Sequence, residues 1–155
     1  MMDKIYQARG VQFQYPADWD LSEQTDGPET TITVSNLETS FWSLTVFADQ
    51  PSPEAVIESA LEAYREEYDE LDIYPTEISI CNREAIARDL EFVCLELINT
   101  AFLRSTVIGN STVLVLFQAT DHELNDTRSI FEQISASLMI ENDDDDDTDD
   151  EIDNV

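Results

Sequence analysis

The sequence predicts a single α+β domain with about six or seven strands and two main helices. Short runs rich in β-branched and aromatic residues follow one another along the chain, and only two segments have helical periodicity. The 155 residues are 42% hydrophobic and include 3 Gly. A chain of this length and composition suits one domain with a substantial hydrophobic core.

The N-terminal strands are predicted over 5–8 and 11–15, on either side of a glycine turn. In the second run apolar residues alternate with glutamines, as in a half-buried strand. Pro16 ends this strand because proline cannot donate to a ladder. We expect Trp19 to pack back against the core, and we interpret Tyr15, Pro16 and Trp19 as a structural motif.

Three further strands and a helix follow this motif. The runs 21–24, 30–35 and 41–47 are predicted strands, the last two because they are rich in β-branched or aromatic residues. Ser52 is a good N-cap and Pro53 is tolerated at the first helical position, so a helix begins there. Its predicted buried stripe comprises Ile57, Ala60, Leu61, Tyr64, Tyr68 and Leu71.

The second half of the chain returns to strand patterns. Runs 73–81 and 101–108 are strand candidates, and between them 83–97 is predicted as one long strand with a bulge or bend. Run 111–119 is highly apolar and β-branched, which favours a position at the centre of the sheet.

A closing helix and an acidic segment complete the chain. Helical spacing of apolar residues predicts a helix over 122–138, with Asp121 as its N-cap. After Ile140 the sequence is rich in aspartate and has no core-forming content. We therefore predict one domain over 1–140 and a disordered acidic tail over 141–155.

The acidic residues set limits on the partner. The net charge is −28, from 35 acidic and 7 basic residues. Residues 141–155 hold 10 of the acids and no base, so the first 140 residues carry 25 acids, 7 bases and a net charge of −18. This argues against nucleic acid and anionic membranes, because both require a basic surface. It allows a basic protein partner, divalent cations, or a surface charge that serves solubility alone.

Cysteines and apolar runs bear on the compartment. The segment 1–7 has no apolar core and no cleavage site of a secretory signal, and no run approaches the roughly 18 apolar residues of a membrane span. We therefore expect a cytoplasmic protein. Cys81 and Cys94 lie in strand-like segments; a position on neighbouring strands is one reading, but in a reducing compartment buried free thiols are favoured.

No motif predicts catalysis, a metal or a cofactor. His122 stands between Asp121 and Glu123, and adjacent helical residues point in different directions, so a solvated helix start is favoured over zinc. The isolated glycines exclude a phosphate-binding loop. Calcium binding by 143–153 would lack the EF-hand pattern, so a solvated segment is favoured. Glu66 and Glu67 belong to a polar helix face rather than to a glycosidase-like pair.

Three of the seven basic residues fall in the predicted strands 83–97 and 101–108. Arg83, Arg88 and Arg104 would form a small patch for an anion or a partner if they shared one face of the sheet. The alternative is cross-strand pairing with neighbouring acids such as Glu84, Asp89 or Glu96.

The order of elements and the aromatic turn resemble the Mog1/PsbP-like superfamily. The resemblance rests on Phe13-Gln14-Tyr15-Pro16-Ala17-Asp18-Trp19, then strands, a Ser-Pro-Glu helix start, a β-meander and a final helix over residues 4–140. It implies an antiparallel sheet flanked by helices, an α/β/α sandwich. Members of this superfamily are mostly non-catalytic: the Mog1 branch binds a Ran-type GTPase, and the PsbP branch serves photosystem II. No functional residue is carried over to this chain.

We therefore expect a non-enzymatic protein-binding or adaptor domain that acts through its sheet or through a groove beside the helices. The alternative is a secretion-related chaperone or accessory protein that holds an extended partner segment on an exposed apolar surface. An enzyme is the third hypothesis, and no catalytic constellation in the sequence supports it.

Overall fold

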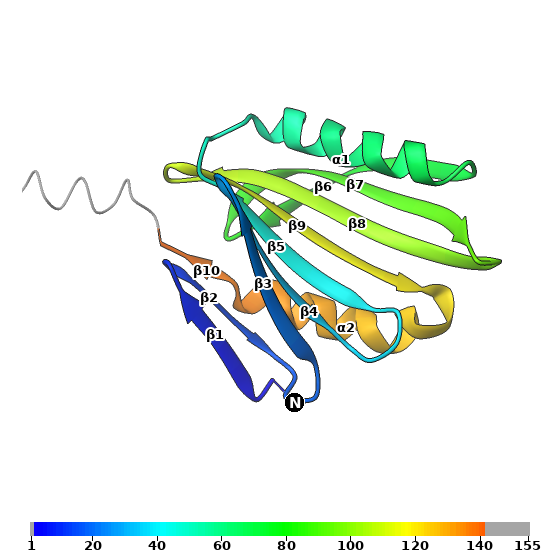
Figure 1. Ribbon diagram of the computed structural model, residues 1–155, viewed down its shortest axis with the longest axis horizontal. Coiled ribbons are helices and arrows are strands. Elements are labelled where there is room, and N and C mark those ends of the chain that lie inside the picture. The colour runs from blue at the N-terminus through cyan, green and yellow to red at the C-terminus, as the bar shows by residue number, and fades with distance from the viewer. Residues whose placement is uncertain (1, 142–155) are drawn as a thin grey trace, which may run out of the picture.

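The computed structural model describes residues 2–141 as two sheets and two helices (Figure 1). The helices are α1 (Pro53–Glu67) and α2 (Asp121–Ser137). A small sheet contains β1 (Lys4–Ala8), β2 (Val11–Tyr15) and β10 (Met139–Ile140). The large sheet contains β3 (Asp20–Asp26), β4 (Glu29–Ser35), β5 (Phe41–Phe47), β6 (Leu71–Ile80), β7 (Arg83–Cys94), β8 (Leu97–Ile108) and β9 (Ser111–Thr120).

The large sheet confirms the predicted α+β class. Its order is β3-β4-β5-β9-β8-β7-β6, and every neighbouring pair is antiparallel. The apolar strand β9 lies at the centre, as its composition predicts. The N-terminal hairpin differs from a simple sandwich, because β1 and β2 pair with each other and with β10 instead of joining the large sheet.

The predicted long strand over 83–97 is wrong. Strand β7 ends at Cys94, and β8 begins at Leu97 after a two-residue turn. Both turn residues, Leu95 and Glu96, have left-handed backbone angles, with φ of 55° and 68°. No bulge interrupts the β7–β8 ladder. The sequence hides this turn because it has none of the Gly, Asn or Asp residues that such turns prefer.

Helix α1 begins as its sequence predicts. The Ser52 hydroxyl accepts a hydrogen bond from the Ala55 amide at 3.0 Å, and Pro53 occupies the first turn. The helix ends at Glu67, so the last two members of the predicted stripe lie beyond it. Tyr68 still packs on the sheet, with its ring 4.3 Å from that of Phe92. α1 covers the face of the sheet formed by β7, β8 and β9.

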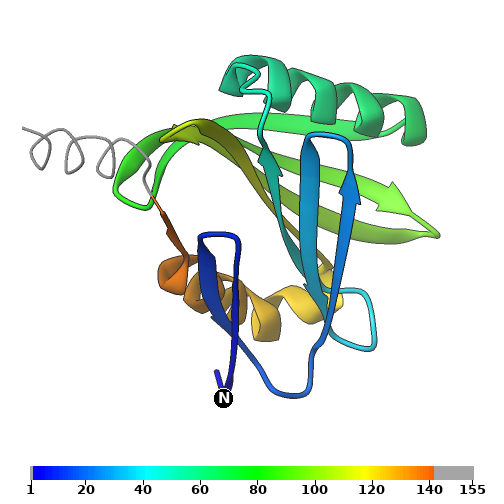
Figure 2. The ribbon, with the colours of Figure 1, turned by 60° about the vertical axis from the view of Figure 1, so that its left-hand side comes forward.

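Helix α2 lies on the opposite face and begins one residue earlier than predicted. Thr120 is the N-cap residue, without a side-chain capping bond, and Asp121 is the first helical residue. Phe131 and Ile134 are fully buried. α2 packs on β8 and β9 of the large sheet and on β2 of the small sheet (Figure 2), so its buried stripe is shared between two sheets.

The aromatic motif joins the small sheet to α2. The Trp19 amide donates to the Pro16 carbonyl at 3.1 Å, which closes the turn after β2. Trp19 is buried and meets the ring of Phe131 edge-on at 6.1 Å. Tyr15 is buried as well. The motif therefore fixes the position of α2 relative to the N-terminal hairpin.

The acidic C-terminal segment and the two cysteines are the remaining features for which the sequence led to expectations. The acidic segment 141–155 lies outside the described residues apart from Glu141, whose amide donates to the Gly10 carbonyl at 2.8 Å. Cys81 and Cys94 are free, half-buried thiols; Cys81 lies in the turn before β7 and Cys94 is the last residue of β7. They are therefore not cross-strand neighbours.

Candidate functional site

A groove of about 600 Å³ lies between the end of β6 and the last turns of α2. We call it the β6–α2 groove. Most of its wall is apolar, and two of its apolar side chains remain largely exposed: Ile78 at 45% and Met139 at 62%. Its large apolar lining residues are Ile78, Ile80, Val115, Phe117, Leu138 and Met139.

The register of the sheet explains why these side chains converge. Ile80 pairs with Arg83, and Ile78 pairs with Ala85. Ala85 and Ile80 both pack in the cluster that contains Phe131 of α2. Since directly opposed residues of antiparallel strands share a face, Ile78 points to the α2 side as well. Because α2 packs on β8, β9 and β2, it leaves this side of β6 uncovered and the groove open.

Arg104 of β8 forms a polar wall of the groove. It is 7% exposed, and its Nη1 donates to Asp89 at 2.9 Å and to the Leu103 carbonyl at 3.1 Å. The guanidinium carbon lies 5.6 Å and 5.9 Å from the ring centres of Phe102 and Phe117. Its Nε is buried without a hydrogen-bond partner among residues 2–141. A buried, fixed cation that keeps an unused donor is unusual, because such groups are normally satisfied.

The structure does not bring the three predicted arginines together. Residues of one strand alternate between faces, so Arg83 points to the α2 side and Arg88 to the α1 side. Arg104 also points to the α2 side, where it pairs with Asp89 as in the cross-strand alternative. Arg88 donates to the Ala87 carbonyl at 2.7 Å. Arg88 therefore does not meet the condition for one patch, which is a face shared by all three residues.

Cys81 lines the groove but is poorly suited to nucleophilic chemistry. It occupies the β6–β7 turn with a left-handed φ of 51°. Its thiol donates to the Leu138 carbonyl at 3.4 Å. Burial raises the thiol pKa, and nearby Arg83 opposes this shift. The reactive form of cysteine is the thiolate, so a raised pKa suppresses reactivity.

The single histidine lies outside the groove. His122 is exposed in the first turn of α2, and its neighbour Glu123 holds the β4–β5 loop. The Glu123 carboxylate accepts bonds from the Asn36 side chain at 3.0 Å, the Thr39 amide at 3.1 Å and the Ser40 hydroxyl at 2.6 Å. Burial raises the Glu123 pKa, but these hydrogen bonds outweigh it and lower the pKa to about 2.

The potential metal ligands and the helices of residues 2–141 bear on two further kinds of function. No group of three or more His, Cys, Asp or Glu side chains in this range is arranged to hold a metal ion. None of the helices there is both long and apolar enough to cross a membrane.

Sequence reasoning missed the β6–α2 groove. Its walls come from four separate segments, namely the end of β6 with its turn, β8, β9, and the end of α2 with β10, and no single motif brings them together. One local signal exists: Ile78 and Ile80 alternate with polar residues in a strand that lies at the edge of the sheet. An apolar face on an edge strand indicates that something covers it or binds to it.

Comparison with solved structures identifies the fold. The solution structure of cyanobacterial PsbP from Synechocystis aligns with a TM-score of 0.56 at 12% identity, over 89% of this chain and 92% of that protein. The chain has a PsbP-like fold. This confirms the predicted Mog1/PsbP-like architecture, and at this identity the likeness concerns the fold alone.

Two further structures share the PsbP-like fold of this chain. A crystal structure from Bacteroides thetaiotaomicron aligns with a TM-score of 0.60 at 16% identity; it covers 91% of this chain, which spans about half, 49%, of that protein. LpqN of Mycobacterium tuberculosis, described as involved in cell envelope biogenesis, aligns with a TM-score of 0.50 at 11% identity, over 84% and 82% of the two chains. No protein-family model matches the sequence, and no curated protein matches it either.

Proposed function

We propose that this domain is a non-enzymatic protein-binding domain and that the β6–α2 groove holds an apolar segment of its partner. The observation that carries the proposal is the pair of exposed apolar side chains at the groove, Ile78 and Met139. Large apolar side chains gathered around a hollow mark interaction sites more often than isolated ones do.

Two polar groups of the groove, Arg104 and Cys81, favour binding over catalysis. Arg104 is already committed to Asp89, and the Cys81 thiol has a raised pKa. A catalytic site instead needs a nucleophile or a base with a pKa matched to its task. The PsbP-like fold is compatible with a binding domain. A secretion-related chaperone would use the same groove, and the identity of the bound partner distinguishes it from an adaptor.

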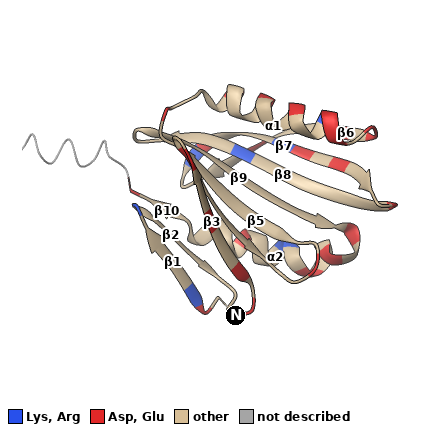
Figure 3. Cartoon of the chain, viewed as in Figure 1, with Lys and Arg blue, Asp and Glu red and all other residues tan. Residues whose placement is uncertain are grey.

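The net charge of this domain predicts a second property of the partner. Acidic residues are spread over both helices and several strands, and basic residues are few (Figure 3). The first 140 residues carry a net charge of −18. Such a field attracts a basic protein and repels nucleic acid and anionic lipid. We therefore propose a partner segment with apolar residues for the groove and basic residues around them.

The test is capture of the partner by the full chain from its native cells, followed by mass spectrometry. Met139→Glu and Ile78→Glu place a charge at the groove without removing buried volume, so the fold should survive. Leu37→Glu is the matched control, because Leu37 is 85% exposed and lies in the β4–β5 loop. Loss of the same identified protein with both groove variants, and its retention by the control, supports the proposal. Retention with all three variants contradicts it.

The charge argument makes a separate prediction. Association with the captured partner should slow as salt rises, because the screening length falls from about 10 Å at 0.1 M to about 3 Å at 1 M. The effect should fall mainly on the association rate. Stopped-flow or surface-binding kinetics at both salt concentrations measure it. A salt-independent association rate would contradict the proposal that the partner is basic. It would not contradict binding of the partner in the β6–α2 groove.

A further inference from the structure

The outer edge of β6 carries unused backbone groups next to the β6–α2 groove. β6 is the last strand of the large sheet, and no strand among the described residues pairs with its outer side. Two observations show which residues point outward. The turn Cys81-Asn82 is a two-residue hairpin loop, so its flanking pair Ile80 and Arg83 exchange their backbone bonds within the ladder. Alternate residues of β6 therefore point inward, starting from Ile80.

Pro75 independently indicates which residues of β6 direct their backbone groups outward. Proline has no N–H, and in an edge strand it occupies positions whose N–H would face solvent. Pro75 differs from Ile80 by an odd number of residues, so both observations direct the odd-numbered residues outward. Glu77 and Ser79 thus present an N–H and a C=O each to the outer edge. No hydrogen bond joins these groups to another element among residues 2–141.

The groove reaches this backbone edge. Ile78, Ser79 and Ile80 all line it. Side chains of a strand alternate between faces, so Ser79 points to the side opposite Ile78. Three consecutive residues can line one groove only if the strand's own backbone forms part of the wall. A segment that enters the groove therefore meets the free donors and acceptors of β6.

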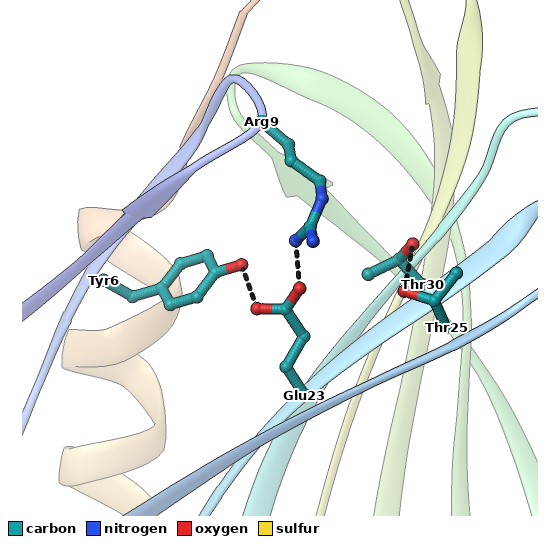
Figure 4. Close-up of polar contacts among 5 residues, drawn as sticks. All are labelled: Tyr6, Arg9, Glu23, Thr25 and Thr30. Carbon is teal, nitrogen blue, oxygen red and sulfur yellow. Dashed lines mark hydrogen bonds and ion pairs between the residues drawn. The ribbon is translucent and has the colours of Figure 1, made fainter.

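The opposite edge strand, β3, likewise has no strand partner on its outer side among the described residues, but one of its side chains is held by the N-terminal hairpin. Strand β3 is the other end strand, and its Glu23 is bound by the N-terminal hairpin (Figure 4). The Tyr6 hydroxyl donates to Glu23 Oε1 at 2.8 Å, and Arg9 forms an ion pair with the other oxygen. Exposed edge strands are normally protected by proline, by charged side chains or by a covering segment. At β6 only Pro75 and the acidic side chains serve that purpose.

We infer that the partner segment adds to the outer edge of β6 as an antiparallel strand, paired with Glu77 and Ser79. This inference rests on the proposed function and specifies how the groove is filled. Side chains of the added strand that point to the α2 side meet Ile78 and Met139, so they are apolar. Those on the other side lie beside Glu77, with Glu84 of β7 one strand further into the sheet, so they are basic. Pro75 limits the pairing to a short segment, because it offers no donor there.

The geometry fixes which backbone groups of the segment are used. Opposed residues of antiparallel strands share a face, so the residues that bond Glu77 and Ser79 carry the basic side chains. The N–H groups of the apolar residues point away from β6. A suitable probe is an end-blocked peptide in which lysine and valine alternate over about seven residues.

The experiment measures binding of this peptide and of two derivatives to the full chain by calorimetry or fluorescence anisotropy. Backbone N-methylation of the lysines should weaken binding about tenfold, because it removes the N–H groups that face β6. Backbone N-methylation of the valines should have little effect. A peptide with the same composition but its valines in one block should bind more weakly than the alternating one.

A variant of the protein gives the reciprocal test. Ser79→Pro removes the outward N–H at a position equivalent to Pro75, which the same strand already tolerates, and Ser79→Ala keeps it. Ser79→Pro should weaken binding of the alternating peptide several-fold, and Ser79→Ala should leave it unchanged. Circular dichroism checks that both variants fold. Equal binding of the two N-methylated peptides, or no binding of the alternating peptide, overturns strand addition. If Met139→Glu still abolishes partner capture in that case, the proposed function stands without it.

Discussion

Helices α1 and α2 cover opposite faces of one sheet, but they do so differently. α1 packs mainly on β7, β8 and β9, and the rings of Tyr64 and Tyr68 contact Phe92 of β7. α2 divides its buried stripe between the large sheet and the small sheet; the Gln14 amide donates to the Ser137 hydroxyl at 2.8 Å, and Trp19 meets Phe131. The small sheet thus holds α2 over the centre of the large sheet and away from β6.

This difference accounts for the groove. A helix that packs on a sheet alone settles where it buries the most apolar area. A helix fixed between two sheets leaves part of one sheet uncovered. On the α2 side the uncovered part is β6 at Ile78, and the proposed partner occupies the place that a wider helical layer would cover.

The largest effect on stability is expected from a substitution that removes a buried contact of α2. Trp19→Ala should lower the free energy of unfolding by about 3–5 kcal/mol, the range for truncating a large buried aromatic residue. It should also weaken partner capture, because the α2 wall of the groove loses its support from the small sheet. Chemical denaturation measures the first effect. An unchanged denaturation midpoint would show that Trp19 does not hold α2.

A matched substitution on the α1 side sharpens the comparison. Leu61 of α1 is 4% exposed, and Leu61→Ala should cost about 3 kcal/mol through the cavity it leaves. Peptide and partner binding should stay unchanged at a temperature where the variant is folded, because α1 does not contact the groove. Weakened binding by folded Leu61→Ala would mean that the two faces are coupled through the sheet.

A smaller effect is expected at the other end of α2. Glu123→Gln keeps the shape of the side chain but removes the charge that accepts three hydrogen bonds, at a cost of about 1–3 kcal/mol at neutral pH. Glu132→Gln, an exposed site on the same helix, is the control.

The pH dependence tests the origin of this effect. The pKa of Glu123 is about 2 in the folded protein and 4.5 for an ordinary glutamate. A lowered pKa stabilises the fold fully above about 4.5, and this contribution is lost as the pH falls toward 2. The stability difference between wild type and Glu123→Gln should therefore shrink over that window. A difference that stays constant from pH 7 to pH 3 would exclude the carboxylate as its source.

Much of the fold could be predicted from local patterns. Strand β5 has the predicted bounds, α1 starts at the predicted cap, and β9 lies at the predicted centre of the sheet. These elements are specified by side-chain alternation, by capping chemistry and by apolar composition. The Leu95-Glu96 turn was missed because its residues carry no turn signal, and the sheet pairing on both sides imposes the left-handed backbone there.

The site depended on relations that local patterns do not contain. Arg83 and Arg88 are five residues apart, so in a regular strand they point to opposite faces; the expectation of a bulge concealed this. The groove depends on where α2 stops along the sheet, and that position is set by Trp19 and the small sheet. A pattern within one segment cannot predict a surface assembled from four.

Pro75 also has a consequence for the behaviour of the protein at high concentration. A bare strand edge invites identical copies to stack into ordered aggregates. Two copies that met at β6 would lack the donors of both prolines and would bring the Glu77 side chains of both copies together on one face. Their net charges would repel as well. The same strand can therefore accept a short basic segment and still resist polymerisation with itself.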